Sequence, residues 1–173
     1  MLLIVLRKGT EKYKGLLLLL EAFKVLKKKR PNAKLAVVGT QLEETPEGVT
    51  WYFDQPRSVT VELFRKATLY VMPALSEPNG ITYLEALANK TPIVGLNRFA
   101  FPEFSGDGKW GFMVENEDHE ELAAVLERAL DDKILLKEMG ETGQKFVMNR
   151  YKWDLVADKM IDEMNWKLKH SKI

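Results

Sequence analysis

Short runs of aliphatic and β-branched residues alternate along the chain with longer segments in which apolar residues recur at helical spacing. Strands are predicted at Leu2–Leu6, Lys34–Val38, Val49–Phe53, Leu69–Met72, Ile93–Leu96 and Phe112–Val114, each apolar enough to be covered on both faces. Helices are predicted at Gly15–Lys29, Val59–Lys66, Ile81–Asn89, Glu120–Leu130, Ile134–Asn149 and Trp153–Leu168. This alternation indicates an α/β fold in which right-handed helical crossovers connect parallel strands.

Residues that break regular structure fall mostly at the boundaries of these segments. Pro31 follows the first predicted helix, and Pro92 precedes the fifth predicted strand. Gly140 and Gly143 lie instead inside a segment with helical spacing. Because glycine disfavours helix interiors, these two residues weaken the helical signal of that segment.

About six parallel strands with helices on both faces are typical of a Rossmann-like, doubly wound sheet, which commonly has the strand order 3-2-1-4-5-6. Ligands bind such sheets outside the carboxyl ends of the strands, where the order reverses between the first and fourth strands. Residues 7–15 follow the first strand, and residues 76–80 lie in the loop after the fourth. We therefore expect these two loops to face each other across one crevice.

The composition indicates a single globular domain over residues 1–173. The chain has 46% hydrophobic and 29% charged residues, enough for a core that buries about 70% of the unfolded surface. A net charge of +1 gives no reason to expect a nucleic-acid partner. The absence of cysteine fits a reducing, cytoplasmic location. The apolar start at residues 1–6 is too short to span a bilayer and is predicted to be a buried strand.

The two loops at the expected crevice carry groups that suit a diphosphate. Arg7 and Lys14 could clamp the diphosphate, arginine as a planar fork and lysine as a mobile point charge. Asn79, Gly80 and Ile81 open a predicted helix, whose N–H groups and positive dipole end attract an oxyanion. Gly80 also lets a phosphate approach the backbone, because it has no Cβ.

Glu77 and Glu85, separated by seven residues, add two carboxylates. Helical spacing places Glu85 beside an apolar stripe of Ile81, Leu84 and Ala88. A carboxylate that is half-buried there needs partners, and a ribose diol offers two hydrogen-bond donors. Taken alone, Glu77 could be an acid favoured by the helix dipole and Glu85 a solvated surface charge. The pair by itself is therefore a weak motif.

An ordered series of short motifs is more specific. The series is Lys14-Gly15, Ala22-Phe23, Pro31, Leu35-Ala36-Val37-Val38-Gly39, Met72-Pro73, Glu85-Ala86-Leu87-Ala88, Pro92-Ile93-Val94, Phe101-Pro102-Glu103, Gly106-Asp107-Gly108, Gly111-Phe112-Met113-Val114, Glu121-Leu122-Ala123 and Tyr151-Lys152-Trp153. In this order the motifs resemble the C-terminal domain of retaining GT-B glycosyltransferases of group 1, the glycogen-synthase and mannosyltransferase-like type. The resemblance covers nearly the whole chain.

The resemblance implies a domain that binds a nucleotide sugar, such as a UDP-, GDP- or ADP-hexose, for retaining hexosyl transfer without a cofactor or metal. Glu77 would face the transferred sugar and assist the transition state, and Glu85 would bind the ribose. Arg7 and Lys14 would bind the diphosphate. The implied backbone contacts to sugar and phosphate come from Asn79, Gly80, Ile81 and Thr82.

The chain departs from the group's pattern near the first strand. Leu6 stands where a glycine usually precedes the arginine, so Lys8 is an alternative to Arg7 as the second diphosphate ligand. Contacts to the nucleotide base are expected around residues 39–42 and 51–57, where the resemblance gives the least guidance.

GT-B enzymes close two domains over the donor, and the resemblance covers only the second domain. It implies an N-terminal domain that contributes the acceptor site, and the acceptor would be a sugar, a glycan or a lipid. Any peripheral contact with a membrane would also come from that domain. The predicted helix within residues 152–168 is expected to pack toward that domain. By itself the chain is expected to bind donor weakly and to transfer nothing at a useful rate, because domain closure would exclude water and align the acceptor.

Other functions stay open. A GT-B-like epimerase would act on the nucleotide sugar itself, and a non-catalytic module would only bind a nucleotide. A receiver-type domain is disfavoured because Arg7 and Lys8 occupy the place of its acidic residues, and neither G-x-G-x-x-G nor a P-loop follows the first strand. His119 and His170 are isolated, so no metal site is predicted.

Overall fold

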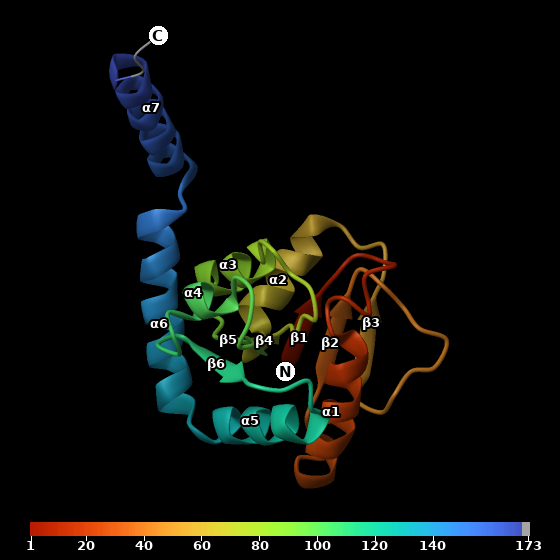
Figure 1. Ribbon diagram of the computed structural model, residues 1–173. Coiled ribbons are helices and arrows are strands. Elements are labelled where there is room, and N and C mark those ends of the chain that lie inside the picture. The colour runs from red at the N-terminus through yellow and green to blue at the C-terminus, as the bar shows by residue number, and fades with distance from the viewer. Residues whose placement is uncertain (171–173) are drawn as a thin grey trace.

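A six-stranded, wholly parallel sheet forms the centre of the computed structural model, which describes residues 1–170 (Figure 1). Its order is β3-β2-β1-β4-β5-β6, which confirms both the predicted fold class and the predicted position of the switch point between β1 and β4. The strands are β1 (Leu2–Val5), β2 (Leu35–Val38), β3 (Val49–Tyr52), β4 (Leu69–Val71), β5 (Ile93–Leu96) and β6 (Gly111–Val114).

Helices cover both faces of this sheet (Figure 1). They are α1 (Leu16–Lys29), α2 (Arg57–Lys66), α3 (Ile81–Ala88), α4 (Phe101–Ser105), α5 (His119–Asp131), α6 (Lys133–Arg150) and α7 (Trp153–His170). Helix α1 packs against α5, and α3 packs against α6. Each of the six predicted helices is present, and no end is shifted by more than two residues.

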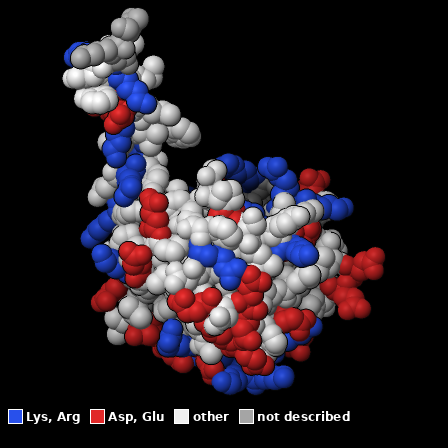
Figure 2. Space-filling model, viewed as in Figure 1, with Lys and Arg blue, Asp and Glu red and all other residues white. Residues whose placement is uncertain are grey.

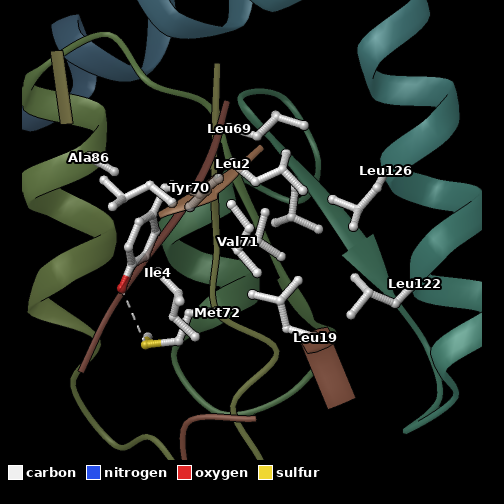
Figure 3. Close-up of a cluster of buried hydrophobic side chains, with 14 of the residues drawn as sticks. Leu2, Ile4, Leu19, Leu69, Tyr70, Val71, Met72, Ala86, Leu122 and Leu126 are labelled. Atoms are coloured by element: carbon white, nitrogen blue, oxygen red, sulfur yellow. Dashed lines mark hydrogen bonds between the residues drawn. The ribbon is translucent and has the colours of Figure 1, made fainter. Parts of the chain in front are cut away.

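Alternation along β4 shows how the two faces are filled. Leu69 and Val71 lie on the side of the sheet covered by Leu19 of α1 and Leu122 of α5, whereas Tyr70 points to the opposite side, toward α3 (Figure 3). All of these side chains are buried. Burying one such leucine contributes about 1.5–3 kcal/mol relative to leaving it exposed, so both helical layers hold the central strands in place.

Helix α4 was not predicted from the sequence. It contains only five residues, begins with Phe101-Pro102 and ends at Gly106, which has a left-handed backbone conformation. One turn is too short to display helical periodicity. Phe101 and Phe104 pack on Tyr83 of α3, with ring centroids 4.9 and 6.4 Å from that ring, so tertiary packing holds the turn.

Helix α6 runs without interruption through Gly140 and Gly143, so the helix predicted over Ile134–Asn149 is confirmed. A Cβ on Gly140 would collide with the carbonyl oxygen of Lys90, and a Cβ on Gly143 would lie 2.5 Å from Leu87 Cδ2. The two glycines allow α6 to approach the end of α3 and the turn that follows it. Their cost in helix propensity is offset by this close packing.

The last helix, α7, extends away from the rest of the chain (Figure 1). None of its residues is buried. Figure 2 shows charged and uncharged side chains together along it. Just before α7, Tyr151 packs on Phe104 and Phe146, with ring centroids 6.2 and 5.6 Å away. Contact with the rest of the chain therefore ends largely where α7 begins.

Candidate functional site

The loops that follow β1 and β4 touch each other through their backbones. The carbonyl of Tyr13 accepts hydrogen bonds from the N–H groups of Leu75 and Ser76, at 2.8 and 3.2 Å. Gly15, at φ 72°, lies so close to the Pro73 carbonyl that a Cβ would collide with its oxygen. The prediction that these two loops meet at the switch point is confirmed.

This contact places Lys14 beside Glu77. The Lys14 ammonium forms an ion pair with Glu77 Oε2, and only 8% of Glu77 is exposed. The other oxygen, Oε1, accepts hydrogen bonds from the N–H groups of Asn79 (3.1 Å) and Gly80 (2.8 Å). Burial lowers the pKa of Lys14. The buried carboxylate is thus satisfied by one ammonium and two amides, as a buried charge requires.

Gly80 lets the chain turn from this loop into α3. Its φ of 62° is a left-handed conformation that costs little only for glycine. A Cβ there would also lie 2.5 Å from the ring of Tyr83. The N–H groups of Asn79 and Gly80, expected from the sequence to contact a ligand, donate to Glu77 Oε1.

Two adjoining hollows lie beside these loops, and both include Val5, the last residue of β1. Each has a volume of about 440 Å³. The first is lined by Val5, Leu6, Arg7, Thr10, Lys14 and Thr82, and the second by Val5, Gln55, Arg57, Thr60, Val61, Phe64, Glu85, Ala88 and Asn89. We call the two together the Val5 groove. It has two predicted diphosphate ligands in one half and the predicted ribose ligand in the other.

Glu85 is half-buried, as predicted, but for a different reason. The buried side chains of α3 are Tyr83, Ala86 and Leu87, and Ile81 is 65% exposed; the expected stripe beginning at Ile81 was therefore wrong. Glu85 faces α2 across the groove, its side chain 32% exposed, and its Oε1 lies 2.9 Å from Arg57 Nη2. Because α2 begins at Arg57 rather than at Val59, this arginine reaches the groove.

The two candidate cations after β1 occupy different places. Arg7 lines the same half of the groove as Lys14. Lys8 lines a separate hollow of about 320 Å³, formed with residues 41–43 and Phe53. Its ammonium lies 5.5 Å from the centroid of the Phe53 ring. Arg7, not Lys8, is therefore the second cation near Lys14.

A hydrogen-bond network that the sequence did not reveal ties this loop to β2. Glu11 Oε1 accepts from the N–H of Gly9 (3.0 Å) and from the hydroxyl of buried Thr40 (2.5 Å). These bonds, chiefly the one from Thr40, lower the pKa of Glu11. The network fixes the loop between Arg7 and Lys14. Its partners are 29 residues apart, so no local pattern could have identified it.

Thr82, the last of the predicted site residues, lies one turn before Glu85 and lines the groove with Lys14. Its hydroxyl oxygen is 2.8 Å from the hydroxyl of Tyr70. Within residues 1–170, no three histidine, aspartate or glutamate side chains come together in a metal-binding arrangement. Nor does any helix in this part of the chain have the length and apolar character to cross a membrane.

Comparison with known proteins places these features in a family. Residues 3–146 match the family described as glycosyl transferases group 1. The capsular polysaccharide biosynthesis glycosyltransferase CapM of Staphylococcus aureus is 26% identical over 170 residues, which cover 92% of this chain and 45% of CapM. An alpha-(1->4)-mannosyltransferase from Mycolicibacterium hassiacum is 35% identical over 96 residues, which cover 55% of this chain and 23% of that protein. The chain thus spans less than half the length of these relatives.

Solved structures show the same fold. The C-terminal domain of the group 1 glycosyl transferase LpcC from Francisella tularensis superposes with a TM-score of 0.73 at 22% identity, covering 88% of this chain and 86% of that domain. A structure of TarM from S. aureus with UDP gives a TM-score of 0.79 at 18% identity, and the match covers 93% of this chain and 34% of the TarM chain. With the family match over residues 3–146, the chain belongs to the group 1 glycosyl transferases, and its fold is that of the C-terminal half of a GT-B enzyme.

Proposed function

We propose that the chain binds a nucleoside-diphosphate hexose as the donor half of a retaining glycosyltransferase. The Val5 groove carries this proposal, because it joins a half with two cations to a half with a partly buried carboxylate. A nucleoside diphosphate needs both, since its phosphates are anionic and its ribose diol donates hydrogen bonds. TarM, a relative in fold, has been crystallised with UDP.

The diphosphate would lie against Lys14, Arg7 and the first turn of α3. Both cations line one hollow, into which Thr82 from that turn also projects. As the bond between the anomeric carbon and the phosphate oxygen breaks, negative charge develops on the diphosphate. Fixed cations and helix N–H groups stabilise such charge at little cost in reorganisation. The proposed site requires no metal ion for this role.

Glu77 would face the transferred hexose. In the free chain its carboxylate holds Lys14 and two amides. A diphosphate that attracts Lys14 would loosen the ion pair and leave Glu77 free to accept hydrogen bonds from the sugar. The acceptor oxygen would then bond to the anomeric carbon on the face from which the diphosphate departs, and its proton would pass to the departing diphosphate oxygen, so the anomeric configuration is retained.

Glu85 would accept hydrogen bonds from the ribose hydroxyls. Its carboxylate would then either bind Arg57 and the ribose together or release Arg57. The Arg57–Glu85 pair is largely solvent-exposed on the arginine side, and exposed ion pairs contribute only about 0–1 kcal/mol. A charge-assisted hydrogen bond from a ribose contributes about 1.5–3 kcal/mol. Opening the ion pair is therefore no obstacle to binding.

The acceptor site would lie on another domain. We propose that α7 packs on that domain, because the helix leaves the body of this chain with no buried residue and the relatives are more than twice as long as the matched region. Six apolar residues of α7 recur at helical spacing on one side, whereas Leu155 and Trp166 lie on the other; the six are Trp153, Val156, Met160, Ile161, Met164 and Leu168.

The decisive test is nucleotide binding by the chain and by a Glu85→Ala variant. Thermal shift with UDP, GDP and ADP should identify at least one that raises the melting temperature. Calorimetry with that nucleotide should show an affinity about 5- to 150-fold lower for Glu85→Ala, equivalent to about 1–3 kcal/mol. The melting temperature of the free variant should change little.

Glu127→Ala provides a matched control. Glu127 is also on a helix, its side chain is 31% exposed, and it pairs with Lys29 at 2.6 Å, away from the groove. This variant should keep wild-type nucleotide affinity. If none of the three nucleotides binds, or if Glu85→Ala binds as well as the wild type, the proposed donor site is wrong.

A further inference from the structure

A buried tyrosine lies directly beneath the Val5 groove. Tyr70, on β4, is fully buried, and its hydroxyl is 2.8 Å from Thr82 Oγ1 and 3.3 Å from the carbonyl oxygen of Val5. Thr82 and Val5 both line the groove. In Figure 3, the Tyr70 ring lies on the side of the sheet that faces α3, and its hydroxyl points toward Met72. The tyrosine thus connects the centre of the sheet to the groove surface.

The Tyr70 hydroxyl remains a proton donor over the physiological range, because burial raises its pKa and the nearby charge of Glu85 adds to the increase. It has one proton to give. Thr82 Oγ1 is the nearest acceptor, at 2.8 Å, whereas the carbonyl oxygen of Val5 and the sulfur of Met72 lie 3.3 and 3.4 Å away. Oxygen–oxygen hydrogen bonds are strongest near 2.7–2.8 Å, so the bond to Thr82 is favoured.

Accepting this bond determines what Thr82 can do with its own proton. A hydroxyl has one donor hydrogen and two acceptor lone pairs. Among the described residues, the partner within reach of the Thr82 proton is the sulfur of Met72, at 3.7 Å. Thioether sulfur is a weak acceptor, so an anionic oxygen in the groove would compete for the proton easily.

We propose that Tyr70 is a positioning residue for the donor diphosphate: by donating to Thr82 Oγ1, it orients the Thr82 hydroxyl as a hydrogen-bond donor to a phosphate oxygen held by Lys14. This inference rests on the proposed donor site. It adds Tyr70 to that site as a side chain that would not itself contact the ligand. A hydrogen bond to a charged phosphate is stronger than one between neutral groups, and a hydroxyl that already accepts a bond is a better donor.

The test compares Tyr70→Phe with Tyr83→Phe. Both tyrosines are buried, and each variant deletes one hydroxyl; that of Tyr83 donates to the Met72 carbonyl at 2.5 Å, away from the groove-lining residues. Calorimetry would use whichever of UDP, GDP and ADP binds most tightly, together with the matching nucleoside, which lacks phosphates. Both variants should lose thermal stability by similar amounts.

We expect Tyr70→Phe to weaken nucleoside-diphosphate binding about 3- to 10-fold, the equivalent of one hydrogen bond. Nucleoside binding should be unchanged, and Tyr83→Phe should change neither. In a Thr82→Val background, Tyr70→Phe should have no further effect, because the hydroxyl through which Tyr70 acts is absent. Thr82→Ser, which keeps the hydroxyl, should bind like the wild type.

Equal losses for nucleoside and nucleoside diphosphate, or the same loss in Tyr83→Phe, would reduce Tyr70 to a structural residue. Additive losses in the double variant would also overturn the inference. If Tyr70→Phe does not fold, Thr82→Val tests the same step at the groove surface, and undiminished diphosphate binding there rejects it. Failure of the wild-type chain to bind any of the three nucleotides would instead reject the donor site itself, and this inference with it.

Discussion

Glu77 is a buried carboxylate whose three hydrogen-bonding partners come from both loops of the site. Lys14 belongs to the loop after β1, whereas the amides of Asn79 and Gly80 belong to the loop after β4. Removing one partner of a buried ion pair leaves the other charge uncompensated. The residue proposed to contact the hexose therefore also contributes to the stability of the two loops.

Glu77→Gln should separate these two contributions. The amide oxygen can still accept from both N–H groups, which share Oε1 in the wild type, but the side chain no longer neutralises Lys14, so we expect a loss of about 1–3 kcal/mol in unfolding free energy. Nucleoside-diphosphate affinity should be preserved, whereas the preference among nucleotide hexoses should weaken. Urea unfolding measures the first effect, and calorimetry with the nucleotide and its sugar derivatives measures the others. Equal losses for both ligands would count against a sugar-facing role.

The Glu11–Thr40 hydrogen bond predicts a dependence of stability on pH. Because the pKa of Glu11 is lowered below its usual value of 4.5, the interaction stabilises the folded chain above that pH and is lost as the pH falls through the lowered pKa. Thr40→Val should return the pKa of Glu11 toward 4.5. Its destabilising effect at pH 7 should shrink when the pH is lowered to about 3.

Carboxyl carbon NMR titration of Glu11 and urea unfolding at the two pH values would measure both effects. Thr45→Val serves as the control, because Thr45 accepts a hydrogen bond from the Trp51 indole at 2.9 Å and involves no carboxylate. Its effect should be the same at both pH values. A Glu11 pKa that does not move in Thr40→Val would contradict the assignment.

At the residue scale, the sequence predicted a set of polar side chains that would come together at the ends of neighbouring strands. Arg7, Lys14, Thr82 and Glu85 all line one groove because the loops that carry them follow neighbouring strands. Arg57 was not recognised as the partner of Glu85, because the two lie 28 residues apart on different helices. Tertiary hydrogen bonds of this kind leave no periodic signal in the sequence.

At the scale of the element, α6 offers a direct test of the role of its glycines. Gly140→Ala should lower stability by about 1–3 kcal/mol, because the added methyl group collides with the backbone of Lys90. Helix propensity alone predicts the opposite, a gain of up to about 1 kcal/mol. Gly143→Ala meets the end of the flexible Leu87 side chain and should cost less.

Thermal unfolding of the two variants would decide between packing and propensity. Glu141→Ala, at an exposed position of the same helix, controls for the general effect of alanine there. A stabilised Gly140→Ala variant would show that α6 does not need this close approach.

Elements with strong periodicity were predictable, and the exceptions have physical causes. The six strands are apolar on both faces because helices cover both sides of the sheet, so each appears as a short continuous run. Helix α4 escaped notice because a single turn held by Phe101 and Phe104 has no repeat to detect. Helix α6 continues through Gly140 and Gly143 because tertiary contacts favour glycine at positions where local propensity disfavours it.

For the whole molecule, α7 should be dispensable to the fold. A chain that ends at Lys152 retains Tyr151 and its ring contacts with Phe104 and Phe146. We expect its melting temperature and nucleotide affinity to match those of the full chain, and its binding of a hydrophobic dye to fall, since the exposed apolar side chains of α7 are removed. A cooperative loss of stability, measured by circular dichroism, would show that α7 supports this domain.

The contact between Tyr13, Gly15 and the β4–α3 loop limits how the site can move. Two backbone hydrogen bonds, the close approach of Gly15 to Pro73 and the Lys14–Glu77 ion pair join the loops, so their separation cannot change without breaking these contacts. Adjustment to a ligand is left to the Lys14 and Arg57 side chains, whose rotations take picoseconds to nanoseconds. In the two-domain enzyme that we propose, slower steps would then arise from movement of one domain relative to the other.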